Sequence, residues 1–166
     1  MYFEILKQIV MNTPTWVYAL FIALVGFGLS QVRARSVSAG RLAIAPLAMA
    51  AWSLSSVIGA FGTVTAAAVW AAGAAVTLGI GLALKRPEGV RYVAQERRFE
   101  IPGSWIPLAL VLAIFAVRYV FAVAMGMDPS LRHSAAFIVV ASLAYGLLGG
   151  LFPSRAVRFW KARTAA

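Results

Sequence analysis

The residue with the clearest chemical potential in this sequence is Arg118, because it is the only charge inside a long apolar stretch. A charge at the centre of a bilayer costs at least about 2.5–3.5 kcal/mol, so such residues usually face a bundle interior or water. No acidic residue lies in any apolar stretch, and the candidate partners Glu4 and Asp128 fall at the edges. Arg118 therefore predicts an anion site. The alternative is a structural arginine that reaches lipid headgroups or helix carbonyls.

Other polar and aromatic side chains are expected at a depth similar to that of Arg118. Together they would line a cavity with a positive floor, open toward the outer side of a membrane. The predicted substrate-binding set is Arg118, Tyr119, Ser53, Ser56, Trp52 and Trp70. The alternative for the serines is hydrogen bonding between helices or back to their own helix.

Metal and enzyme chemistry are disfavoured by the residue types present. The chain has no cysteine and a single histidine, His133, which lies near Met125, Met127 and Asp128. Thioethers and imidazole suit copper, but this spacing matches no strong motif, so we predict no metal and no cofactor. No nucleophile–base pair, glycine-rich phosphate loop or pair of carboxylates within one apolar stretch is present, which disfavours an enzyme.

Long apolar helices must position these residues. Of the 166 residues, 62% are hydrophobic and 12% are charged, whereas soluble domains average about 45–50% and 25%. A helix needs about 20 mostly apolar residues to span a bilayer. We therefore predict an all-α polytopic membrane protein with five transmembrane helices, at 14–32, 42–60, 63–84, 105–127 and 134–152.

Three segments flank these spans. Residues 1–13 place apolar and polar side chains on opposite helix faces, which predicts an amphipathic segment at the outer interface, with a frayed end as the alternative. The loop 85–104 alternates apolar and polar residues on both sides of 94–97, which predicts a small β-hairpin. Residues 153–166 form a basic tail. The first span follows no basic segment and precedes arginines, so we interpret it as a retained helix.

The distribution of lysine and arginine predicts the orientation. With five spans, twelve of the fifteen basic residues lie on one side and two on the other. The positive-inside rule then places the N-terminus outside and the C-terminus in the cytoplasm. This explains the net charge of +10 without nucleic acid. The basic residues expected to contact anionic lipid headgroups are Arg33, Arg35, Lys85, Arg86, Arg155 and Arg158.

Small residues at intervals of four indicate close helix packing. One such stripe runs from Ala67 through Ala71, Ala75 and Gly79 to Ala83, and a second contains Ser142, Gly146 and Gly150. We expect the third span to be central, the fifth to pack tightly on a neighbour or on another subunit, and the protein to form a homo-oligomer. The alternative for the small residues is that they line a pore. The shared Pro-Leu-Ala at 46–48 and 107–109 suggests a tandem repeat of two helical hairpins, with coincidence as the alternative.

One stretch of the sequence also supports a family resemblance. The stretch contains Gly89-Val90-Arg91-Tyr92, Phe99, Pro102-Gly103-Ser104-Trp105, Pro107-Leu108-Ala109-Leu110, Ile114-Phe115 and Arg118-Tyr119. It resembles an uncharacterised family of small multi-helix integral membrane proteins of proteobacteria. The resemblance implies an inner-membrane protein with several helices. It implies no catalytic or binding residue.

The leading functional expectation is a small transporter or channel for an anionic or amphipathic solute, with Arg118 at the site. The rival is a non-transporting scaffold or lipid-interacting protein that acts through its basic cytoplasmic loops. In both cases the expected partners are membrane lipids with anionic headgroups.

Overall fold

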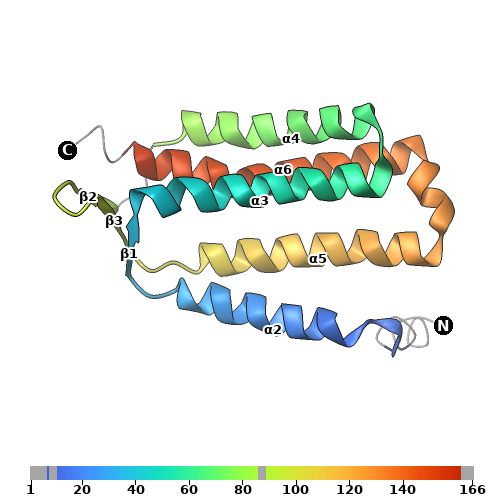
Figure 1. Cartoon of the computed structure of the whole chain (residues 1–166), viewed down its shortest axis with the longest axis horizontal. Helices are drawn as coiled ribbons and strands as arrows, with labels where there is room; N and C mark the ends of the chain where they lie inside the picture. The colour runs from blue at the N-terminus through green and yellow to red at the C-terminus, as the bar shows by residue number, and fades with distance from the viewer. Residues whose placement is uncertain (1–6, 8–10, 86–88, 162–166) are drawn as a thin grey trace.

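The computed structural model describes residue 7, residues 11–85 and residues 89–161. The predicted interfacial segment 1–13 lies mostly outside the described residues, as do Arg86 and the last five residues of the predicted tail. Within these limits the chain is a bundle of α-helices that lie along one long axis, with a small sheet at one end (Figure 1).

Among the described residues, the bundle consists of five α-helices: α2 (Thr15–Ser30), α3 (Ala39–Phe61), α4 (Val64–Ala83), α5 (Ile106–Met127) and α6 (Ala135–Trp160). The last four are each long and apolar enough to cross a membrane, so the prediction of an all-α fold with long apolar helices is confirmed for these elements. With 16 residues, α2 is about 24 Å long, less than the roughly 30 Å of a hydrocarbon core. The fifth span stays a prediction.

Polar residues and one glycine set the helix ends. The Thr63 side chain accepts a hydrogen bond from the backbone N–H of Ala66 at 3.2 Å, which caps the start of α4. Gly62 has a left-handed φ of 61° and ends α3, in the two-residue gap between the predicted spans 42–60 and 63–84. The sequence Thr13-Pro14 predicts a threonine N-cap followed by proline at the first helical position, and this prediction is wrong. Pro14 holds the cap position, and the Thr13 hydroxyl bonds to Tyr119 instead.

The closest helix contact joins α4 to α6 through small side chains. Ser142, Gly146 and Gly150 are buried on α6, which confirms the predicted stripe and the tight packing of the fifth predicted span. A Cβ added to Gly73 of α4 would lie 2.9 Å from the carbonyl oxygen of Leu143. The two backbones therefore approach more closely than side chains would allow.

Two expectations about α4 are wrong. The helix at the centre is α6, which packs against α3, α4 and α5, whereas α4 lies at the edge of the bundle (Figure 1). The buried face of α4 carries Ala66, Gly73, Ala74, Thr77 and Gly81, and most of the predicted stripe from Ala67 to Ala83 is exposed. Because α4 has small residues on nearly every face, their spacing alone does not select the face that packs.

A three-stranded antiparallel sheet lies at one end of the bundle. The predicted hairpin is confirmed as β2 (Arg91–Val93) and β3 (Arg98–Ile101). A third strand, β1 (Arg35–Ser38), was not predicted from the sequence; it pairs with β3 in the register Arg35↔Ile101 and Ser38↔Arg98. The two connections thus joined carry five of the ten described arginines. We call this end, with β1, β2, β3 and the last turns of α6, the arginine-rich end.

A small apolar cluster fixes the sheet to the helices. Phe99 of β3 is fully buried, and its ring contacts those of Tyr92 and Trp160 at centroid distances of 4.8 and 6.0 Å. Phe159 belongs to the same cluster, so α6 continues through Pro153 to Trp160 rather than ending at Phe152 as expected. Packing of these last turns against the sheet and α4 outweighs the helix-breaking tendency of proline.

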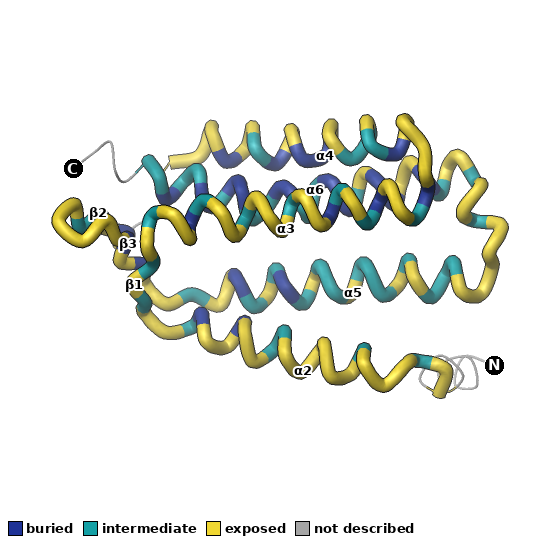
Figure 2. Tube along the Cα trace, viewed as in Figure 1, coloured by how far each residue is buried: buried dark blue, intermediate teal, exposed yellow. Residues whose placement is uncertain are grey.

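Large apolar side chains cover much of the outside of the bundle. Figure 2 shows buried positions mainly where α6 faces α3 and α4, with exposed positions along α2. Ile22, Ile44 and Val64 are among many exposed large hydrophobic residues. A soluble protein rarely exposes apolar surface on this scale, whereas lipid would cover it.

Candidate functional site

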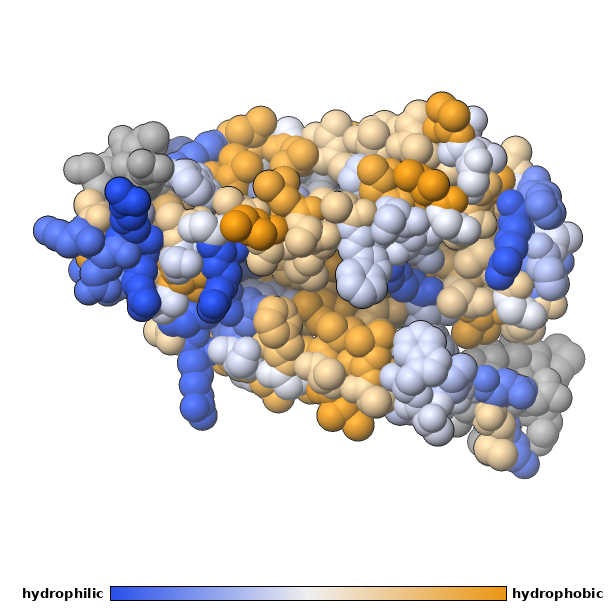
Figure 3. Space-filling model, in the orientation of Figure 1, coloured by the Kyte–Doolittle hydropathy of each residue, from blue (hydrophilic) through white to orange (hydrophobic). Residues whose placement is uncertain are grey.

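A cleft of about 870 Å³ lies between α2, α3 and α5. Its walls are largely apolar, with Leu20 and Leu24 from α2, Met49 from α3 and Phe115 from α5. Figure 3 shows the molecule hollowed on its long side, between α3 and the pair α2 and α5, with hydrophobic side chains around the hollow. The cleft opens on the flank of the bundle, where lipid would lie around a membrane protein.

Arg118 is the charged residue that lines this cleft. It is half-buried on α5, and its Nη1 donates a long hydrogen bond of 3.4 Å to the hydroxyl of Ser56 on α3. The guanidinium carbon also lies 5.2 Å from the centre of the Tyr145 ring on α6. One hydroxyl and one aromatic face thus hold Arg118 in place from the two neighbouring helices.

Within the described part of the chain, Arg118 has no carboxylate partner. Asp128 accepts hydrogen bonds from the hydroxyl and the backbone N–H of Ser130, at 2.6 and 3.0 Å, in the turn after α5. These bonds hold the pKa of the Asp128 carboxyl below its ordinary value. Glu4 lies outside the described residues. The Arg118 charge is therefore balanced here only by a hydroxyl and a ring.

Tyr119 fixes one wall of the cleft. Its hydroxyl is 2.6 Å from the Thr13 hydroxyl, which ties α5 to the residues just before α2. Its ring stacks on Phe115, whose ring in turn meets Phe21 of α2 at a centroid distance of 5.2 Å. These contacts hold α2 against α5.

Trp52 and Ser56 contribute from the opposite wall, on α3. Trp52 lines the cleft with 73% of its surface exposed. Ser56 donates to the Trp52 carbonyl at 2.8 Å while it accepts from Arg118. The structure thus brings together four predicted residues, Arg118, Tyr119, Trp52 and Ser56.

The other two predicted residues, Ser53 and Trp70, do not line the cleft. The Ser53 hydroxyl is buried, donates to the Tyr145 carbonyl at 3.3 Å and accepts from the Trp70 indole N–H at 3.2 Å. This chain of bonds joins α3, α4 and α6, which matches the interhelical alternative for the serine. Sequence reasoning missed Tyr145, whose signal was a lone tyrosine amid apolar and small residues of α6.

The predicted headgroup-contacting residues that the structure describes lie at or beside the arginine-rich end. Arg33 and Lys85 are exposed, Arg35, Arg155 and Arg158 are half-buried, and Arg86 lies outside the described residues. Burial in β1 lowers the pKa of the Arg35 guanidinium. Among the residues that the structure describes, no three His, Cys, Asp or Glu side chains gather as a metal site.

The fold and the cleft define a bundle of membrane-type helices with an apolar cleft on its flank and one arginine in that cleft. The chain belongs to DUF6622, a family of unknown function whose pattern matches residues 2–166. Membership confirms the expected uncharacterised family. No curated protein and no solved structure matches the chain.

Proposed function

We propose that the protein binds an amphipathic anion in the cleft and acts as a small transporter or channel for it. The observation that carries this proposal is the Arg118 guanidinium, which lines an apolar cleft without a carboxylate partner in the described chain. A cation in such surroundings attracts an anion strongly, because little water screens the charge.

The cleft walls favour an amphipathic solute over a small hydrated ion. The cleft volume of about 870 Å³ lies within the range of roughly 300–1,000 Å³ that is usual for ligand pockets. Its lining combines a single arginine with many apolar side chains, so an acidic head would bind at Arg118 and a hydrocarbon body along α2 and α5. The opening on the flank would admit such a molecule from the lipid.

The proposed setting is the inner membrane of a proteobacterium, with five spans and the arginine-rich end in the cytoplasm. In Figure 1 successive helices alternate in direction, which is compatible with α2 as a tilted or locally thinned fifth crossing. A tandem repeat of α3–α4 and α5–α6 remains part of this proposal. A homo-oligomer is supported by the exposed small residues Ala71 and Ala75 on α4.

Binding of a charged amphiphile tests the role of Arg118. The probe is a pyrene-labelled decanesulfonate, which is permanently charged, with pyrene-labelled decanol as its neutral counterpart. Energy transfer to pyrene from tryptophan, including Trp16 and Trp52 in the cleft, reports binding to protein in nanodiscs. A hydrogen bond to a charged group contributes about 1.5–3 kcal/mol, so Arg118→Gln should weaken sulfonate binding by about 10- to 100-fold and leave decanol binding unchanged.

The matched control is Arg132→Gln, which removes an exposed arginine from the turn between α5 and α6. It should bind both probes like the wild-type protein. Proteoliposomes loaded with the sulfonate then test transport, and efflux should fall with Arg118→Gln only. Equal sulfonate affinity in Arg118→Gln and wild-type protein would refute the proposed site, whereas binding without efflux would refute only transport.

The second candidate function is a non-transporting scaffold or lipid-interacting protein. The observation that favours it is the sheet, because β1 and β3 join two basic connections into one surface. Replacing residues 94–97 at the hairpin tip with Gly and Ser separates the candidates. A transporter would keep its efflux, whereas a scaffold would show no protein-dependent efflux before or after the change.

A further inference from the structure

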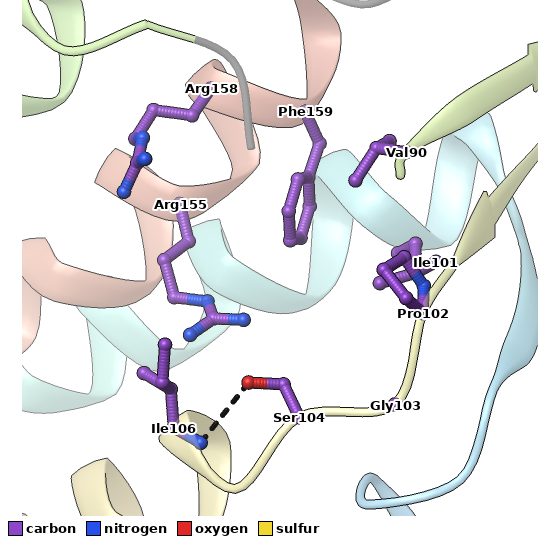
Figure 4. Close-up of a pocket in the computed structure, with 9 residues that line it drawn as sticks. All are labelled: Val90, Ile101, Pro102, Gly103, Ser104, Ile106, Arg155, Arg158 and Phe159. Atoms are coloured by element: carbon purple, nitrogen blue, oxygen red, sulfur yellow. Dashed lines mark hydrogen bonds between the residues drawn. The ribbon is translucent and has the colours of Figure 1, made fainter. Parts of the chain in front are cut away.

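A second, smaller pocket of about 230 Å³ lies at the arginine-rich end, outside the cleft of the proposed function. It is enclosed by the end of β3, the start of α5 and the last turns of α6 (Figure 4). Ile101, Val90 and Phe159 form its apolar side, and Arg155 and Arg158 form its charged side. The pocket therefore combines a preformed wall with two guanidinium groups.

The two arginines come from one turn of α6 and differ in how they are held. Arg158 donates from Nε to the Lys85 carbonyl at 3.2 Å, which positions the side chain and leaves its Nη groups for another partner. The guanidinium carbon of Arg155 lies 5.6 Å from the centre of the Phe159 ring. In the described chain, the Arg155 guanidinium donates no hydrogen bond. Figure 4 shows both side chains beside the pocket.

A third arginine adds positive charge to this region. The charges of Arg158 and Arg35 both act unfavourably on that of Arg155, which is itself half-buried. No carboxylate among residues 7, 11–85 and 89–161 forms an ion pair with any of the three. Glu100 is exposed and neighbours Phe99 and Ile101, which are buried, so it points to the opposite face of β3. Three close cations without an acid leave unbalanced repulsion that a bound anion would relieve.

The backbone around the pocket adds to the positive field. The 22-residue helix α5 begins here, with the Ser104 hydroxyl accepting from the Ile106 N–H at 3.2 Å, so the positive end of its dipole faces the pocket. The Ser104 N–H bonds to the Gln31 carbonyl at 3.3 Å. A Cβ at Gly103 would collide with the backbone of Val32. The wall is therefore fixed by close packing to the end of α2.

We infer that this pocket binds a tetrahedral phosphate-type oxyanion between Arg155 and Arg158. Two guanidinium groups offer several N–H donors to the oxygens of one phosphate. The planar guanidinium matches phosphate oxygens well because it can donate two parallel hydrogen bonds. Trp105 and Ile106, which flank the pocket, are 65% and 58% exposed, as expected of residues at a membrane surface. A phosphate could therefore come from a phospholipid headgroup or from solution.

Thermal unfolding of the delipidated protein in dodecyl maltoside tests this inference at constant ionic strength. The probes are dioleoyl phosphatidylglycerol, dioleoyl glycerol (which lacks the phosphate) and inorganic phosphate. Wild-type protein should be stabilised by the phospholipid and not by dioleoyl glycerol. Stabilisation by inorganic phosphate at similar concentrations would assign the site to a soluble anion, and stabilisation by the phospholipid alone would assign it to a headgroup.

The test variant is the double substitution Arg155→Gln and Arg158→Gln. It should bind the stabilising phosphate probe at least about tenfold more weakly. Without any phosphate, it should unfold at the same temperature as the wild-type protein or at a higher one, because the repulsion among the arginines is reduced. This second expectation separates loss of the site from loss of the fold. The more conservative Arg155→Lys and Arg158→Lys pair, which keeps the charge and loses the planar forks, should bind with intermediate affinity.

The matched control replaces Arg91 and Arg98, two exposed arginines of the sheet, with Gln, and should keep wild-type affinity. Arg118→Gln should also keep it, so failure of the cleft proposal and failure of this one are distinguishable. The inference is overturned if no phosphate probe stabilises the wild-type protein, or if the control pair loses as much affinity as the Arg155 and Arg158 pair.

Discussion

The contact between α4 and α6 yields the sharpest prediction, at Gly146. A Cβ at this position would collide with the carbonyl oxygen of Trp70 and lie 2.9 Å from the Trp70 Cα. Ordinary contacts begin at 3.4 Å, and the carbonyl oxygen is the nearer atom, so Gly146→Ala must open the helix pair by about 1 Å here. The obstructing atoms belong to the backbone of α4 and have no alternative rotamer.

The expected energy follows from two opposing terms. Overpacking of this kind typically lowers the free energy of unfolding by about 1–3 kcal/mol. Part of that loss arises because the separated helices leave gaps of about 0.5–1 Å along the pair, and each gap loses about a quarter to a half of a dispersion contact. Alanine favours a helix over glycine by about 1 kcal/mol. Gly79→Ala is the matched control on α4, because nothing lies within 4 Å of its added Cβ. Gly146→Ala should therefore be less stable than Gly79→Ala by about 1–3 kcal/mol.

Unfolding in mixed micelles of dodecyl maltoside and sodium dodecyl sulfate, followed by circular dichroism, measures this difference. Gly79→Ala should match the wild-type protein or exceed its stability by up to about 1 kcal/mol, the propensity term alone. If Gly146→Ala and Gly79→Ala unfold at the same detergent fraction, then close backbone approach does not hold α4 to α6. The reasoning about the small-residue stripe would then be refuted.

Two further predictions concern buried side chains elsewhere. Phe99→Ala should destabilise the sheet cluster by about 3–5 kcal/mol because it empties the centre of the cluster, and hydrogen exchange should accelerate in β1 and β3 more than in α4. Ser142→Ala should leave stability unchanged or raise it, because its hydroxyl is fully buried with no hydrogen-bond partner in the described chain. Ser53→Ala is the contrasting variant. It leaves the Trp70 indole N–H without its acceptor and should cost about 1–3 kcal/mol in the same unfolding assay, so equal effects of the two serine variants would contradict the assigned bonds.

Much of the fold could be predicted because it depends on local composition. Long apolar runs demand helices in lipid, since every backbone polar group there must be bonded within its own segment. The turn at Gly62 could also be predicted, because a glycine between two helices favours a left-handed cap. The hairpin around residues 94–97 could be predicted because alternating apolar residues indicate strands over a short range. Strand β1 was missed because its partner lies about sixty residues away, and four residues rich in Ser and Arg resemble a loop.

The candidate site was predictable only in part for the same reason. Arg118 could be predicted because a charge within an apolar run is costly in lipid whichever face of the helix carries it. Ser53 and Ser56 are three residues apart on α3, yet Ser56 contacts Arg118 and Ser53 bonds to Tyr145 and Trp70. Three residues along a helix turn the side-chain direction by about 300°, so Ser53 and Ser56 point only about 60° apart, and even that difference changes which neighbouring helix each one meets.

By itself, the sequence determined that the chain forms apolar helices, that basic residues gather between and after them, and that one arginine lies within an apolar run. These properties follow from the free-energy cost of exposing polar groups to lipid. Each segment meets that cost through its own composition, independently of its neighbours. Only the tertiary structure decided that α6 is central, that β1 joins the hairpin, and that Arg118 lines a cleft between α2, α3 and α5. Those features depend on which helix faces fit one another, and a helix with small or apolar residues all round does not encode that choice locally.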